Sequence, residues 1–226
     1  VEELIYDGRQ SRVLFSGPMH SAQSGLAIDD NPRLLFDYIQ QLYELADELR
    51  PKTILLLGGG TLTLPTALLK LLPEAVITAV EINPSLIRLA KDYFGYIKDP
   101  RLNVEIDDAT HFIANAKKKY ELIITDLYND LAIPDPFLSL SFARQLRRVL
   151  APNGLVATNC ISALSGNGSF PMTKLAEVYK EAIGRVRAIR VDKRHYMNWT
   201  PQNLLILSGS GADSVLTGLS EVQLEG

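Results

Sequence analysis

The sequence predicts an α/β fold built around a doubly wound, mostly parallel sheet of seven strands. Apolar runs alternate with amphipathic helical patterns along most of the 226 residues, and parallel strands need such helices as crossover connections. The last two runs, 186–191 and 204–207, are joined by a polar segment without a helical pattern, which fits an antiparallel pair and one reversed strand. Ligands of such sheets bind outside the carboxyl ends of the strands.

The stretch 53–81 carries the strongest local pattern, a βαβ unit. Ile54–Leu57 is an apolar run without polar alternation, which is typical of a parallel strand covered on both faces. Three glycines follow it: Gly58, Gly59 and Gly60. A helical pattern and a second strand then lead to Glu81, about 20 residues after the glycines, where a carboxylate can accept hydrogen bonds from ribose hydroxyls.

The glycine run also has a plainer interpretation, because a tight strand-to-helix turn needs glycine for steric reasons. The order of strand, glycines, helix, strand and acid favours nucleoside binding over that interpretation. The run is not G-x-G-x-x-G, since Thr61 and Thr63 follow the glycines. This departure favours a single adenosyl group over a dinucleotide.

Three regions are expected along the chain. Residues 1–30 hold short apolar runs split by turn residues, which predicts a small antiparallel hairpin or sheet. Residues 31–208 form the Rossmann-type domain. The tail, 209–226, is low in hydrophobicity and is expected to be partly disordered. The chain begins at Val1 rather than Met, which is compatible with the removal of residues upstream.

Acidic residues end two further strands. Asp107 and Asp108 follow the third strand and Asp126 the fourth, so they are expected beside Glu81 at one edge of the sheet. Asp108 is either the cap of a helix that begins at Ala109 or an acceptor for an adenine amine. Asp126 is either a turn residue or a carboxylate that deprotonates or orients an attacking amine.

Composition argues against several classes of protein. A net charge of −3 and a pI near 5.7 disfavour general nucleic-acid binding, and no apolar stretch is long enough to span a bilayer. Cys160 is the single cysteine, which excludes an internal disulfide and a multi-cysteine zinc site. The three histidines are scattered and have no acidic partners at ligand spacing, which argues against a metal site. The motif G-x-S-x-G is absent, which excludes an α/β-hydrolase. We therefore expect a cytoplasmic protein that uses no metal and binds neither nucleic acid nor membrane.

Five segments, in order, carry a resemblance to a known family. They read LLLGGGTLTLP, ITAVEINPSLIRLAKDYFG, VEIDDATHFI, YELIITDLYND and LRRVLAPNGLVATN. Over about residues 25–160 the chain resembles the spermidine synthase (polyamine aminopropyltransferase) superfamily. The resemblance implies a class I methyltransferase-like Rossmann fold that binds S-adenosylmethionine, its decarboxylated form or methylthioadenosine.

The resemblance also implies roles for single residues. The glycines would flank the nucleoside and the methionine-derived part, Glu81 would hold the ribose, and Asp108 with Ala109 the adenine. Asp126 would be the catalytic acid that assists the attacking amine. The implied cofactor-binding positions are Gly58, Gly59, Gly60, Glu81, Ile82, Asp108, Ala109, Asp126 and Leu127. The candidates for the acceptor side, on position alone, are Gln23, Tyr128, Asn129, Asp130 and Trp199.

The chain departs from the synthase pattern at several positions. Thr61 stands where the synthases have an aspartate that binds the aminopropyl amine of the decarboxylated donor. This change removes an ion pair with the ammonium, and it also removes repulsion toward a donor that keeps its carboxylate. The pattern Asp-Ser-Ser-Asp-Pro appears at 126–130 with the second acid shifted by one, and the Tyr-Gln/His-Glu motif is not evident in 35–38. The N-terminal sheet also looks shortened.

These observations predict a transferase of alkyl groups. The leading hypothesis is aminopropyl transfer from decarboxylated S-adenosylmethionine to a small (poly)amine, with methylthioadenosine as product, because Asp126 is retained. The first alternative is a methyltransferase of a small molecule or protein that uses S-adenosylmethionine and releases S-adenosylhomocysteine, which Thr61 favours. The second is a non-catalytic nucleoside-binding homologue. The family also suggests a homodimer formed through the N-terminal elements.

Overall fold

The computed structural model describes residues 1–17, 20–29, 34–129, 132–191, 197–213 and 220–222. Its strands are β1 (Glu2–Tyr6), β2 (Arg9–Ser16), β3 (Ser21–Ala27), β4 (Thr53–Leu57), β5 (Val76–Glu81), β6 (Leu102–Ile106), β7 (Tyr120–Thr125), β8 (Leu150–Ser162), β9 (Val186–Arg190), β10 (Gln202–Ser208) and β11 (Ser220–Val222). Its α-helices are α1 (Asp37–Leu49), α2 (Thr63–Leu71), α3 (Pro84–Tyr93), α4 (Ala109–Asn115), α5 (Leu140–Val149) and α6 (Phe170–Ala182). Short 3-10 turns are η1 (Asp135–Leu138), η2 (Asn167–Ser169) and η3 (Ser210–Asp213). Within these ranges, no helix has the length and apolar character needed to cross a membrane.

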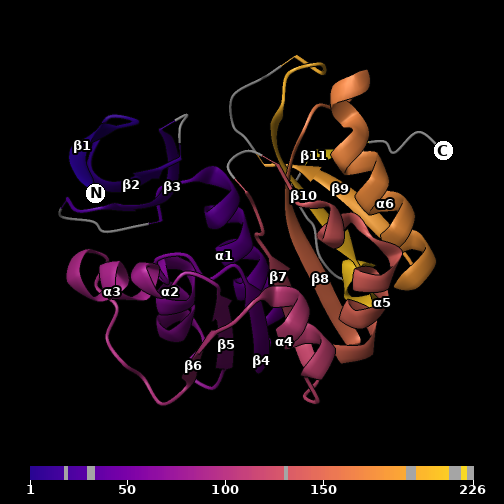
Figure 1. Ribbon diagram of the computed structural model, residues 1–226, viewed down its shortest axis with the longest axis horizontal. Coiled ribbons are helices and arrows are strands. Elements are labelled where there is room, and N and C mark those ends of the chain that lie inside the picture. Colours follow the sequence, from indigo (N-terminus) through magenta and orange to yellow (C-terminus); the bar gives the residue numbers. More distant parts are fainter. Residues whose placement is uncertain (18–19, 30–33, 130–131, 192–196, 214–219, 223–226) are drawn as a thin grey trace.

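Among the described residues, the central sheet has eight strands in the order β11-β9-β10-β8-β7-β4-β5-β6 (Figure 1). β6, β5, β4, β7 and β8 are parallel neighbours, and β10 is antiparallel to both β8 and β9. These seven strands, with β10 reversed, confirm the predicted doubly wound sheet. The eighth, β11, comes from the tail and pairs with β9, where Glu221 also accepts hydrogen bonds from Arg187.

Two apolar cores cover the two faces of this sheet. Leu42 of α1 and Leu68 of α2 pack with Ile54 of β4 on one face. Leu55, the next residue of β4, belongs with Leu146 of α5 to the core on the other face. Successive side chains of a strand point to opposite faces, so an uninterrupted apolar run is what a strand buried on both sides requires. Figure 1 shows α1, α2 and α3 on one side of the sheet and α5 and α6 on the other.

The first three strands form a separate antiparallel sheet in the order β1-β2-β3, which confirms the expected small N-terminal sheet. β3 contacts α2, the helix that follows the glycine turn. The small sheet therefore lies beside the carboxyl end of β4 (Figure 1), where the sequence predicts the ligand site.

Candidate functional site

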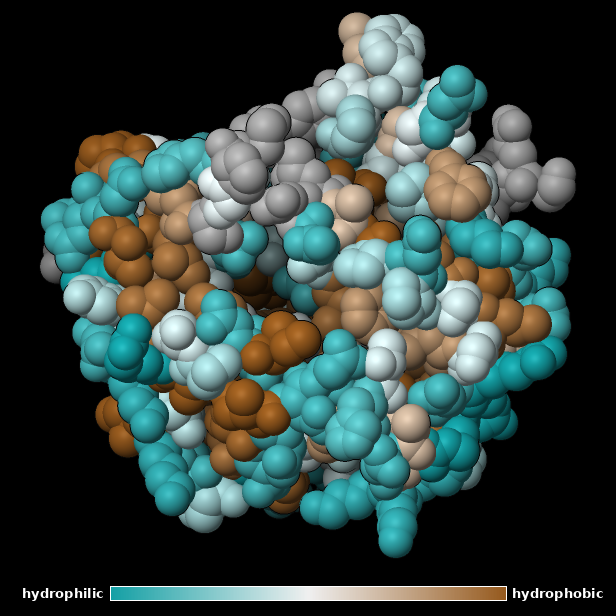
Figure 2. Space-filling model, viewed as in Figure 1, coloured by the Kyte–Doolittle hydropathy of each residue, from teal (hydrophilic) through white to brown (hydrophobic). Residues whose placement is uncertain are grey.

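A cavity of about 1170 Å³ lies between the carboxyl edge of the central sheet and the N-terminal sheet. Figure 2 shows its opening as a hollow near the middle of the face. The four predicted groups at the strand ends all reach its wall: the glycine turn, Glu81, the pair Asp107 and Asp108, and Asp126. They meet there because β4, β5, β6 and β7 are parallel and adjacent, so their carboxyl ends share one edge.

The glycine turn is sterically required by the chain segment that follows β7. Gly58 has a φ of +92°, and a Cβ on it would lie 2.1 Å from the carbonyl oxygen of Asp126. The backbone N–H groups of Gly58 and Gly59 both donate to the carbonyl of Val80, at 3.0 and 2.9 Å. The turn is thus fitted to β5 on one side and to Asp126 on the other.

Glu81 ends β5 and is 7% exposed. Its Oε2 accepts a hydrogen bond from the Gly60 N–H at 2.7 Å, and its Oε1 accepts one from the Asn83 N–H at 2.9 Å. Burial raises the pKa of this carboxyl, the hydrogen bonds from the backbone oppose the rise, and the charge of Asp126 adds to it. The carboxylate is therefore held in one orientation at the cavity wall by the glycine turn itself.

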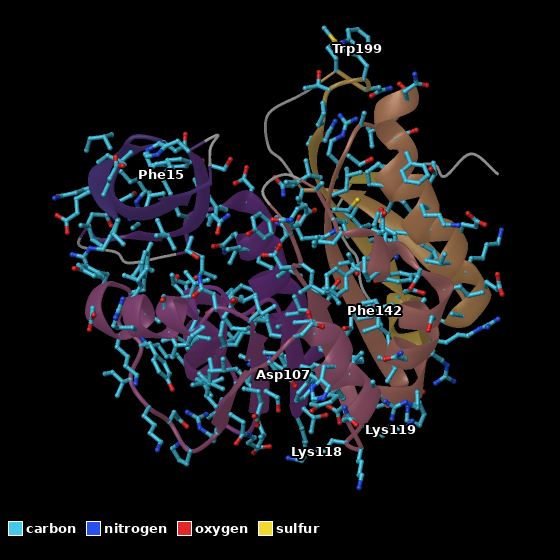
Figure 3. The ribbon with its side chains drawn as sticks, in the orientation of Figure 1. Phe15, Asp107, Lys118, Lys119, Phe142 and Trp199 are labelled. Carbon is cyan, nitrogen blue, oxygen red and sulfur yellow. The ribbon has the colours of Figure 1, made fainter. Side chains whose placement is uncertain are left out.

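Asp107 and Asp108 follow β6 at the start of α4 (Figure 3). Asp108 caps the helix: its Oδ1 accepts from the backbone N–H of Thr110 at 2.7 Å and of His111 at 3.3 Å, and from the Thr110 hydroxyl. The Thr110 hydroxyl is the main cause of the lowered pKa of this carboxyl. Asp107 pairs with His111 Nδ1 at 2.7 Å. Asp108 caps α4 and also lines the cavity. Its role as a helix cap is therefore compatible with the predicted role as an acceptor for a ligand.

Asp126 follows β7 and is held by two side-chain donors. Its Oδ2 accepts from the Tyr38 hydroxyl at 3.0 Å, and its Oδ1 accepts from Asn159 Nδ2 at 2.9 Å. Burial raises the pKa of the carboxyl, and the bonds from Asn159 and Tyr38 act against that rise. Burial and the nearby charge of Asp126 raise the pKa of Tyr38, so its hydroxyl remains a donor. The site thus holds a partly buried carboxyl group in fixed geometry.

Three residues of this arrangement are not predicted by the sequence analysis: Tyr38, Asn159 and Asn203. Asn159 is 3% exposed, and its Oδ1 accepts from Asn203 Nδ2 at 2.9 Å. Tyr128 closes the same corner, since its hydroxyl donates to the Asn159 carbonyl at 3.1 Å and accepts from the Ile161 N–H at 2.6 Å. The polar pair Thr158 and Asn159, within the otherwise apolar run 155–161 on β8, is the signal that could have revealed part of this network.

The remaining predicted residues are divided between the cavity and other places. Gln23, Ile82, Ala109, Leu127, Tyr128 and Asn129 line the cavity. Gly59 does not line it, because a Cβ there would face Leu62 and Glu81 inside the turn. Trp199 lies outside it, 69% exposed at the far tip in Figure 3, because its turn is hydrogen-bonded to the loop after β8. Asp130 falls outside the described residues.

Thr61, the position of the synthase aspartate, is 1% exposed and does not line the cavity. Leu62, with a φ of +57°, follows it in the left-handed conformation at the start of α2. The Thr61 hydroxyl is buried and has no hydrogen-bond partner among the described residues. The side chain at this position therefore points into the protein rather than toward a ligand.

The charge of the cavity wall has one sign. Six carboxylates line it: Asp7, Asp37, Glu81, Asp107, Asp108 and Asp126. No lysine, arginine or histidine is found among the lining residues that the structure describes. A low-dielectric cleft lined by one sign of charge concentrates ligands of the opposite sign, so this cavity favours cations. Over the same described ranges, no group of three or more histidine, cysteine or acidic residues is arranged to hold a metal ion.

The family model for the spermine/spermidine synthase domain matches residues 37–166, which is more than half of the chain. The chain belongs to the spermine/spermidine synthase family. The match runs from the start of α1 to the loop after β8, and so it contains Asp126 and both of its side-chain donors, Tyr38 and Asn159.

Similar curated proteins come from two kinds of transferase. The polyamine aminopropyltransferases of Vibrio vulnificus and Pseudomonas syringae are 30% and 26% identical over 58% and 88% of this chain, and over 45% and 76% of their own lengths. The human eEF1A lysine and N-terminal methyltransferase is 29% identical over 61% of this chain and 20% of its own length. The chain thus spans less than half of the Vibrio protein and about three quarters of the Pseudomonas one. Both kinds of relative are named as transferases of alkyl groups, the class of enzyme that the sequence predicts.

Solved structures agree on the fold. A probable spermidine synthase from Corynebacterium glutamicum has a TM-score of 0.72 at 23% identity, with coverage of 83% of this chain and 69% of that chain. Human methyltransferase-like protein 13 in complex with SAH has a TM-score of 0.65 at 22% identity, covering 81% and 86%. A spermidine synthase in complex with the transition-state analogue AdoDATO has a TM-score of 0.66 at 17% identity, covering 90% and 75%. The methyltransferase-like Rossmann fold is therefore confirmed.

Proposed function

We propose that this protein binds an adenosyl sulfonium and transfers an alkyl group from it to the nitrogen of a small amine. The first candidate for the transferred group is aminopropyl. The observation that carries the proposal is Asp126, a partly buried acid that two side-chain donors hold at the cavity wall. Membership of the spermine/spermidine synthase family supports the same chemistry.

The residues of the cavity fit an adenosyl donor. The two oxygens of Glu81 accept from the backbone N–H groups of Gly60 and Asn83, and a carboxylate has about four lone-pair sites, so it keeps acceptor capacity for ribose hydroxyls. A Cβ on Gly60 would meet only the Ser24 hydroxyl, at 3.3 Å, so a ligand can approach the backbone there. A volume near 1170 Å³ is sufficient for a nucleoside and an amine together. Two structural relatives hold SAH and AdoDATO, which are ligands of this adenosyl class.

Asp126 has the position and environment of a proton acceptor for the amine. An ammonium must lose a proton before the nitrogen lone pair can attack the carbon bonded to the sulfonium. The new carbon–nitrogen bond forms as the carbon–sulfur bond breaks, its electron pair goes to sulfur, and Asp126 takes the proton. Burial raises the pKa of the carboxyl and so makes the carboxylate a stronger base, while the hydrogen bonds from Asn159 and Tyr38 favour its ionised form. The carboxylates of the wall stabilise the positive charges of both reactants.

Methyl transfer from S-adenosylmethionine is the second candidate, and Thr61 favours it. Position 61 is a threonine whose side chain is buried outside the cavity, so it supplies no carboxylate that could pair with an aminopropyl ammonium. Methyl transfer depends mainly on in-line positioning of donor and nucleophile, so it would depend less on Asp126.

Calorimetric titration with decarboxylated S-adenosylmethionine, S-adenosylmethionine and methylthioadenosine tests these candidates. Preference for the decarboxylated donor supports aminopropyl transfer, and preference for the carboxylated donor supports methyl transfer. Binding without turnover across a panel of amines identifies a non-catalytic homologue. Binding of none of the three ligands refutes the adenosyl assignment.

The variant Asp126→Asn tests the role of the carboxylate. We expect turnover to fall about 10²- to 10⁴-fold, with nucleoside affinity nearly unchanged, because the lost group acts in the proton transfer. Asp7→Asn is the matched control, since Asp7 lines the cavity on the turn after β1 and its loss removes the same charge. Unchanged turnover in Asp126→Asn would refute this role.

A further inference from the structure

Asn159 links Asp126 to a second asparagine on a different strand. Its Nδ2 donates to Asp126 Oδ1 at 2.9 Å, and its Oδ1 accepts from Asn203 Nδ2 at 2.9 Å. Asn159 is 3% exposed, so water cannot freely replace either partner. Both ends of this buried amide are thus occupied, one by the proton acceptor and one by Asn203.

The pairing of the strands explains this alignment. β7 and β8 are parallel with Thr125 opposite Thr158, so the next residues, Asp126 and Asn159, are neighbours. β8 and β10 are antiparallel with Leu205 opposite Asn159, which places Asn203 two residues away, on the same face of the sheet. Side chains in such a diagonal relation are within reach of each other. The residue after β7 and one residue each of β8 and β10 thus form the row.

The two ends of the Asn159 amide are not equivalent toward a carboxylate. In the observed orientation an N–H group faces Asp126, which favours the ionised carboxylate. The reversed orientation would place the Asn159 carbonyl oxygen against Asp126, where only a protonated carboxyl could donate to it. With the Asn203 amide in its observed orientation, the reversal would also place the Asn159 NH₂ against the NH₂ of Asn203, two donors without an acceptor.

We infer that Asn203 is a positioning residue for Asp126: by donating to Asn159 it holds the side-chain amide in the orientation that stabilises the Asp126 carboxylate. The consequence for turnover rests on the proposed function, in which Asp126 accepts the proton of the amine. The hydrogen-bonded row itself does not depend on that function.

Three other groups also interact with Asp126, and a test of Asn203 must leave their interactions unchanged. Tyr38 of α1 donates to its second oxygen. Glu81 at the end of β5 and Tyr128 on the segment after β7 interact with its charge. None of these three bonds the Asn159 side chain, so a change at Asn203 leaves them in place.

The test is a direct titration of the Asp126 carboxyl by ¹³C NMR, with the resonance assigned by its loss in Asp126→Asn. Asn203→Leu removes the donor without adding charge. Asn203→Asp keeps the size but offers only acceptors, so it favours the reversed Asn159 amide and adds a like charge. Asn129→Leu is the matched control, since Asn129 lines the cavity and its side chain makes no hydrogen bond to Asn159 among the residues that the structure describes.

We expect the titration midpoint of Asp126 to rise in Asn203→Leu, to rise further in Asn203→Asp, and to stay in place in Asn129→Leu. On the acid limb of the kcat/KM profile, activity should fall about tenfold for each pH unit of that rise. If the midpoint is unchanged in both folded Asn203 variants, the inference is overturned, whatever their activity. If the midpoint shifts but the wild-type protein alkylates no amine, the positioning role stands and the proposed function fails.

Discussion

Replacement of Gly58 by alanine is the sharpest perturbation of the site that one added carbon can make. A Cβ at this position would lie 2.1 Å from the Asp126 carbonyl oxygen and 2.9 Å from the carbonyl carbon. These are backbone atoms, so no side chain can rotate away to relieve the contact. The glycine turn and the end of β7 would have to separate.

The size of the effect follows from this geometry. Ordinary contact distances near 3.5 Å require the two segments to move apart by about 1 Å or more. A shift of about 1 Å in a reacting group can lower the rate of an enzyme about 10²-fold. The positive φ of +92° adds a conformational cost of about 1–3 kcal/mol for a residue with a side chain. Gly58→Ala should therefore lose both stability and turnover.

Gly95→Ala is the matched control for the conformational cost. Gly95 also has a positive φ, +70°, but a Cβ there would meet no atom within 4 Å. Urea unfolding of both variants measures the stability loss, and steady-state kinetics with saturating donor and amine measures kcat. We expect a stability loss in both variants but a large fall in kcat only in Gly58→Ala.

Two results would contradict this reasoning. If Gly58→Ala unfolds at the same urea concentration as Gly95→Ala and keeps wild-type kcat, the close approach of the turn to Asp126 does not position the site. If Gly95→Ala loses as much kcat as Gly58→Ala, the loss reflects general destabilisation instead of displacement of Asp126.

Substitutions at three further positions give additional tests, two positions in the cavity wall, Tyr38 and Asp108, and one buried outside it, Thr61. Tyr38→Phe removes one of the two side-chain donors to Asp126, so the pKa of that carboxyl should rise. The acid limb of the kcat/KM profile should therefore move to higher pH, and an unchanged acid limb would contradict this role of Tyr38. Thr61→Val replaces a buried hydroxyl that has no partner among the described residues, and it should stabilise the fold by about 1 kcal/mol in urea unfolding without changing donor preference. A loss of stability would instead reveal a partner for the hydroxyl. Asp108→Ala should lower the free energy of unfolding by about 1 kcal/mol at neutral pH, because it removes the cap of α4. Asp108→Asn should keep most of that stability, because asparagine also caps helices. Because the pKa of Asp108 is lowered in the folded protein, its ionic contribution is present above the unfolded-state pKa and is lost as the pH falls through the folded-state pKa, so the difference from wild type should shrink in acid.

Much of this protein can be predicted from its sequence, for a definite physical reason. The buried run 54–57, the glycines and the acid at position 81 form a local unit, in which the spacing along the chain determines the spacing in the fold. Asp107, Asp108 and Asp126 are predictable at the same edge because parallel strands with helical crossovers have all their carboxyl ends on one side. The sequence by itself therefore determines the fold class and the edge where the acids gather.

Only the tertiary structure decides what surrounds those acids. Tyr38 reaches Asp126 from a helix, and Asn203 reaches Asn159 from the reversed strand β10, so both contacts depend on packing between segments distant in the sequence. Thr61 is buried, and Leu62 after it has a left-handed conformation that composition does not predict. The strand β11 forms because the edge of β9 offers unpaired backbone groups and Arg187 offers a partner for Glu221. Hydrophobic patterning is local and can be read along the chain, whereas the direction of a polar side chain depends on which strand or helix lies opposite it.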